Sequence, residues 1–66
     1  MTLWRVSLAK FQVYEDGKGE FRWRLRADNN EVIAISSEGY TRKESSMYVM
    51  DLVKKLSPIS EVEDQT

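Results

Sequence analysis

The feature that most constrains this chain is a period-two alternation of apolar and polar residues over residues 20–27. Its apolar members are Phe21, Trp23, Leu25 and Ala27, and its polar members are Glu20, Arg22, Arg24 and Arg26. Successive side chains of a strand point to opposite faces, so this spacing predicts a strand with one buried and one polar face. A helix would instead distribute the arginines around its whole circumference.

One further strand is expected before this one in the chain, and another after it. Residues 10–14 carry Phe11 and Val13 on one face, and residues 31–36 are rich in β-branched residues, which favour strands. The Asp-Gly-Lys-Gly segment at 16–19 and the Asp-Asn-Asn segment at 28–30 supply the residues that tight turns require. The pattern predicts a three-stranded antiparallel meander.

The expected third strand is apolar on both of its faces. Val32 and Ala34 share one face, and Ile33 and Ile35 share the other. A strand of this kind is typically covered on both sides. We therefore expect the chain's own helix to cover one face, and a cover from elsewhere on the other.

A single helix is expected after the third strand. Thr41 and Glu44 have the spacing of a capping box, in which each side chain bonds the backbone amide of the other residue. Apolar residues then recur at helical spacing as far as Leu56, and Pro58 ends the run. The fold class is α+β, a β-β-β-α arrangement with the helix packed on one face of the sheet.

The N-terminal residues leave two alternatives open. Trp4, Val6 and Leu8 alternate, but on the opposite parity from Phe11 and Val13. Either a bulge near residue 9 lets strand one continue, or residues 1–8 form a separate arm. The expected division is an arm or short strand at 1–8, a domain at 9–57 and an acidic disordered tail at 58–66.

Several segments together carry a resemblance to a known family. They are Phe11-Gln12-Val13-Tyr14-Glu15-Asp16, Phe21-Arg22-Trp23-Arg24-Leu25-Arg26-Ala27, Ser37-Glu38-Gly39-Tyr40, Lys43 and the run from Val49 to Lys55. In these segments the chain resembles the YegP-like family of small uncharacterised proteins. The resemblance implies the same β-β-β-α fold and no established activity. Some members carry two copies in one chain, which implies that a single-copy chain pairs with itself.

Composition excludes several classes of function. The chain has no cysteine and no histidine, which removes disulfides, thiolate zinc sites, thiol nucleophiles and the commonest general base. No catalytic residue, metal site or cofactor is expected, and the chain is predicted not to be an enzyme. The beginning of the chain is too short and polar for a signal peptide, and no apolar run is long enough to span a membrane, so a cytoplasmic protein is expected.

Size favours self-association. A chain of 66 residues buries only about 60% of its unfolded surface and has no disulfide to assist it. We therefore predict a homodimer. The candidate dimer contacts are the apolar residues without an assigned cover, Trp4, Val6, Leu8, Ile33 and Ile35.

The polar face of the second strand gives the remaining hypothesis. The residues that could bind an anion or nucleic acid there are Lys10, Tyr14, Arg22, Arg24 and Arg26. The alternative is a solvated face whose arginines pair with acids on neighbouring strands. The net charge of −1 favours this alternative. The sequence thus predicts a homodimeric interaction domain, with a nucleic-acid-binding module as the second candidate.

Overall fold

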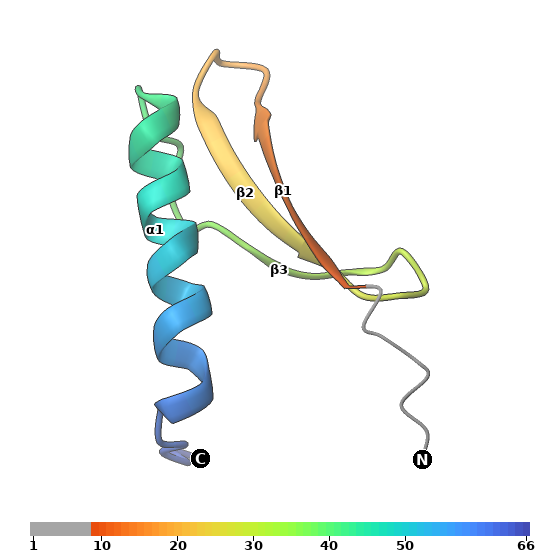
Figure 1. Cartoon of the computed structure of the whole chain (residues 1–66), viewed down its shortest axis with the longest axis vertical. Helices are drawn as coiled ribbons and strands as arrows, with labels where there is room; N and C mark the ends of the chain where they lie inside the picture. The colour runs from red at the N-terminus through yellow and green to blue at the C-terminus, as the bar shows by residue number, and fades with distance from the viewer. Residues whose placement is uncertain (1–8) are drawn as a thin grey trace.

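The computed structural model describes residues 9–66 as three strands followed by one helix (Figure 1). The strands are β1 (Lys10–Glu15), β2 (Phe21–Arg26) and β3 (Val32–Ile35), and the helix is α1 (Lys43–Leu56), which a short 3-10 turn, η1 (Ser57–Ile59), extends. The expected α+β fold and element order are confirmed. Trp4, Val6 and Leu8, and the question of how strand one begins, lie outside the described residues.

The three strands form one antiparallel sheet in the order β1-β2-β3. In its register Val13 lies opposite Trp23, and Gln12 lies opposite Arg24. On the other side of β2, Arg24 lies opposite Ile35, and a bulge follows between Leu25 and Arg26. Directly opposite residues point to the same side of a sheet. One side therefore carries Trp23, and the other carries the arginines together with Ile35.

The two turns use the polar residues that the sequence indicated, with one difference in detail. Asp16 Oδ1 accepts hydrogen bonds from the amides of Lys18 (2.9 Å) and Glu20 (3.0 Å), which closes the β1–β2 turn. The positive φ of this turn falls on Gly19 (80°) rather than on the glycine directly after the aspartate. In the second turn Asn30 has a φ of 72°, a left-handed conformation that asparagine adopts more readily than most residues.

The predicted capping box at the start of α1 is wrong. Arg42 is the N-cap residue, with extended backbone angles (φ −124°, ψ 138°), and no side chain caps the helix. Backbone hydrogen bonds between Phe21 and Tyr40, of 2.7 and 2.8 Å, hold the segment before the helix against the first residue of β2. This pairing holds Tyr40 next to the sheet, and α1 begins after Arg42 rather than after Thr41, so the tertiary contact overrides the local capping signal. The helix ends at Leu56, before Pro58, as predicted.

The core lies between α1 and the β1–β2 hairpin. Trp23 is 6% exposed, and it is the only large apolar side chain within residues 9–66 that is buried. The Phe11 ring packs edge-on against it, with ring centroids 5.8 Å apart. Ser46 of α1 is buried as well. Of the predicted buried face of β2, Trp23 is buried, whereas Phe21 and Leu25 are only half-buried. The fold is therefore anchored by one large side chain.

The expectation that α1 covers one face of β3 is wrong. The helix approaches β1 and β2 but not β3. Ile33 and Ile35 are 58% and 59% exposed. Figure 1 shows the C-terminal half of α1 extending away from the strands. The radius of gyration is 14.1 Å, against about 11 Å for a compact domain of this length. The chain therefore buries apolar surface at one end and exposes it at the other.

Candidate interaction surfaces

The five residues proposed for anion binding come together on the side of the sheet that faces away from α1. Together with one further residue they form a surface that we call the arginine face: Lys10, Gln12 and Tyr14 of β1, and Arg22, Arg24 and Arg26 of β2. The added residue, Gln12, was not predicted. Its place in the alternation of β1 could have indicated it, but only once the strand register was known.

Arg22 is compensated by a carboxylate. Its Nε donates to Asp16 Oδ2 over 2.8 Å, and its terminal nitrogen lies 3.4 Å from the carbonyl oxygen of Ser36. The hydrogen bond from Arg22 holds the pKa of Asp16 below its usual value, and the same bond raises the pKa of Arg22. This ion pair links β2 to the first turn. The charge of Arg22 is thereby used in a contact that stabilises the fold.

Arg24 and Arg26 are positioned without a carboxylate. Both donate from Nε to the same oxygen, Gln12 Oε1, at 2.8 and 2.9 Å. Arg26 also donates to the backbone oxygen of Asn30, at 2.7 Å. The Arg24 guanidinium lies 4.3 Å from the centre of the Tyr14 ring. Neither arginine forms an ion pair with any acid of residues 9–66.

Two guanidinium groups are therefore held side by side by one neutral oxygen. Each guanidinium has five N–H donors, and these contacts use one donor of Arg24 and two of Arg26. Planar forks of this kind match the oxygens of a carboxylate or phosphate. The arrangement can bind an anion with partners that are already ordered.

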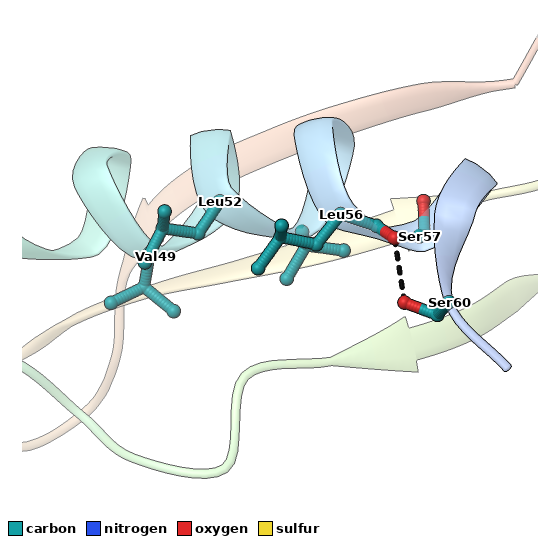
Figure 2. A pocket seen from close by; sticks show the side chains of 6 residues that line it. Val49, Leu52, Leu56, Ser57 and Ser60 are labelled. Carbon is teal, nitrogen blue, oxygen red and sulfur yellow. Dashed lines mark hydrogen bonds between the residues drawn. The ribbon is translucent and has the colours of Figure 1, made fainter.

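A second surface lies along the C-terminal half of α1. It is an apolar groove of about 290 Å³, which we call the helix groove (Figure 2), lined by Val49, Leu52, Val53, Leu56, Ser57 and Ser60. Ser60 Oγ donates to the carbonyl oxygen of Leu56 over 2.6 Å and closes one end of the groove. Leu56 is 51% exposed. The sequence predicted this apolar stripe, but as part of the helix–sheet contact.

Within residues 9–66 no group of acidic residues could hold a metal ion. In the same part of the chain no helix has the length and apolar character that crossing a membrane requires.

Comparison with known proteins identifies the family of this chain. The model of a domain of unknown function, DUF1508, matches residues 16–64, which include β2, β3 and α1. The chain belongs to the DUF1508 family. This confirms the resemblance to a small uncharacterised family, and the match extends beyond α1 into the acidic tail.

Similar proteins of this family come from several bacteria. A UPF0339 protein of Neisseria meningitidis serogroup B is 47% identical over 55 residues, covering 79% of this chain and 96% of its own length. A UPF0339 protein of Agrobacterium fabrum is 49% identical over 57 residues, covering 86% and 90%. The chain thus spans nearly the whole of both relatives.

A solved structure supports the fold. The NMR solution structure of a protein from Haloferax volcanii is similar with a TM-score of 0.78 and 36% sequence identity, and the match covers 85% of this chain and 93% of that one. The β-β-β-α architecture is therefore shared with a related protein whose structure has been determined.

Proposed function

We propose that this DUF1508 chain is a non-enzymatic interaction domain that works as a homodimer in the cytoplasm. The observation that carries the proposal is the presence of two exposed apolar surfaces in one chain. One is concave, the helix groove, and the other is the strand β3, whose Ile33 and Ile35 are more than half exposed. Both surfaces are apolar and open to solvent, so burial of one against the other is favourable.

A two-fold pair would use both surfaces twice. In such a pair the same patch appears on each subunit, so the groove of each copy can receive the isoleucines of the other. Burial of an isoleucine side chain contributes about 1.5–3 kcal/mol relative to full exposure, so four such side chains could support a dimer. Trp4, Val6 and Leu8 remain predicted contacts outside the described residues.

Molar mass in solution tests the dimer. We expect light scattering at several concentrations to give twice the 7.7 kDa mass of one chain at micromolar concentration. Stability should also rise with protein concentration, because association favours the folded form. A mass near 7.7 kDa throughout would contradict the proposal.

Substitutions then locate the interface. Ile35→Ser and Leu56→Ser should each weaken the dimer at least tenfold, because they place a hydroxyl in an apolar contact. Tyr48→Ser is the matched control, since Tyr48 is an exposed apolar residue of α1 outside the groove. A dimer that Ile35→Ser and Leu56→Ser leave unchanged, or that all three substitutions weaken equally, would contradict this interface.

The second candidate is a nucleic-acid-binding module. The uncompensated guanidinium groups of Arg24 and Arg26 favour it, because phosphates suit such forks. Arg24 already occupies one face of Tyr14, however, and this leaves less of the ring for a base. Titration with single- and double-stranded oligonucleotides at low salt tests the candidate. Tight binding that falls steeply with salt, and is lost in Arg24→Ala/Arg26→Ala, would support it.

A further inference from the structure

We propose that the anion held by Arg24 and Arg26 is the acidic C-terminal tail of the partner copy. The inference rests on the proposed homodimer and adds a specific polar contact to it. The tail residues concerned are Glu61, Glu63 and Asp64, which place three negative charges within four positions. Each subunit would thus complete the arginine face of the other.

The arginine pair is an anion site that lacks its anion partner within the described chain. Gln12 Oε1 fixes both guanidinium groups at 2.8–2.9 Å, so two like charges are held close together. This arrangement is unfavourable unless a negative charge or solvent compensates it. With Lys10 and Arg22 the arginine face carries four cations, and Asp16 is the one acid paired with them in residues 9–66.

The tail is an anionic segment without a cationic partner. Glu61 and Glu63 form no ion pair with any residue of 9–66, and Asp64 accepts hydrogen bonds only from Thr66. Val62, between the two glutamates, is 95% exposed. The tail therefore combines acidic residues with an apolar one. The side of the sheet that carries the arginines likewise combines a cation, Arg24, with an apolar residue, Ile35. The two compositions are complementary.

The strand register brings the two segments together in the proposed dimer. Ile35 lies directly opposite Arg24 on the same side of the sheet, at the spacing of neighbouring strands, about 5 Å. The helix groove ends at Ser60, and Glu61 follows immediately. If the Ser60 end of the groove lies over the partner's Ile35, Glu61 and the next residues come within reach of Arg24, since each extended residue adds about 3.4 Å.

The same geometry disfavours contact within one chain. The helix packs on the Trp23 side of the sheet, and the arginines occupy the other side. The chain's own tail leaves α1 on the wrong side and would have to pass around an edge strand. A tail supplied by the second copy can reach the arginines without passing around an edge strand.

A double-mutant cycle on the dimer tests the contact. At about 20 mM salt we expect Glu61→Gln/Glu63→Gln/Asp64→Asn to raise the dimer dissociation constant about five- to tenfold in sedimentation experiments, with little change at 0.5 M salt. Arg24→Gln/Arg26→Gln should have a similar effect, and the combined chain should be no weaker than either alone. The control, Glu38→Gln/Glu44→Gln/Asp51→Asn, removes three exposed carboxylates elsewhere and should leave the constant within twofold.

A mixing experiment decides which copy supplies the tail. The ¹⁵N-labelled chain with the neutralised tail should show Arg24 and Arg26 Nε–H resonances shifted from those of the native protein. Excess unlabelled native chain should return these resonances toward their native positions, because the mixed dimer contains a native partner tail. Resonances that stay unchanged on mixing would overturn the inference.

The two proposals fail in different ways. A monomeric mass at every concentration would remove the homodimer and the tail contact with it. A stable dimer in which the tail and arginine effects simply add would remove the tail contact alone. The inference would also be wrong if inorganic phosphate shifted the arginine resonances equally in the native and tail-neutralised chains, because the tail would then not occupy the pair.

Discussion

The two ends of this molecule differ in how completely they are packed. At the hairpin end, which comprises β1, β2 and the segment before α1, Trp23 is buried with the Phe11 ring edge-on against it, and backbone hydrogen bonds join Phe21 to Tyr40. At the other end, β3 has no helix over it, and the last turns of α1 expose the groove around Leu56. The difference indicates a division of roles, in which one end maintains the fold and the other is available for association.

The largest expected effect tests the packed end. Trp23→Ala should unfold the domain near room temperature, because truncation of a buried aromatic costs about 3–5 kcal/mol, close to all that a core this small supplies. Circular dichroism melting measures this directly. Arg24→Ala, on the opposite side of the same strand, is the control and should melt near the wild type. A cooperative Trp23→Ala melt within a few degrees of wild type would mean that the hairpin end does not hold the fold.

The next effect tests the close approach between the first turn and the segment before α1. A Cβ on Gly39 would lie 2.9 Å from Glu20 Cβ, closer than such atoms pack. Gly39→Ala should therefore cost about 1–3 kcal/mol in urea unfolding, because the backbone has to shift. The control is Gly17→Ala, since nothing lies within 4 Å of a Cβ there. Equal stability of the two variants would contradict the close contact.

A smaller effect should appear in the pH dependence of the hairpin end. The bond from Arg22 lowers the pKa of folded Asp16, so this pair stabilises the fold above the unfolded pKa of about 3.9. The contribution is lost as pH falls through the lower folded pKa. Asp16→Asn should thus reduce the melting temperature at neutral pH and make little difference in strong acid. Arg22→Gln should reproduce this profile, and a difference that grows as the pH falls would contradict the assignment.

The smallest effect on folding is expected at the C-terminal end of the chain, after α1. Deletion of residues 59–66 should change the unfolding free energy of the monomer by no more than about 0.5 kcal/mol, because these residues are exposed. It should also strengthen anion binding by the arginine face, since three negative charges are removed. Hydrogen exchange with and without the tail measures the first effect. Protected amides beyond Ile59 in the native chain would mean that the tail is part of the fold.

Much of the fold could be predicted because its signals are local. The alternation around Trp23 determined which face of β2 is buried, since a strand has a fixed period of two. The Asp-Asn-Asn segment at 28–30 marked the second turn, and Pro58 marked the end of α1. The arginine row followed from the same alternation. These features depend only on backbone geometry and on residues close together in the chain.

Only the tertiary structure decided which surfaces are covered. The sequence placed α1 over the sheet but could not give its path, so β3 was wrongly expected to lie beneath it. The predicted cap was wrong because a distant partner, Phe21, holds Tyr40 extended. Gln12 contacts Arg24 and Arg26 only because of the strand register. These arginines lie 12 and 14 positions further along the chain. Alternation within a strand determines which side of the sheet a residue faces. Contacts between distant segments determine which residues it packs against on that side.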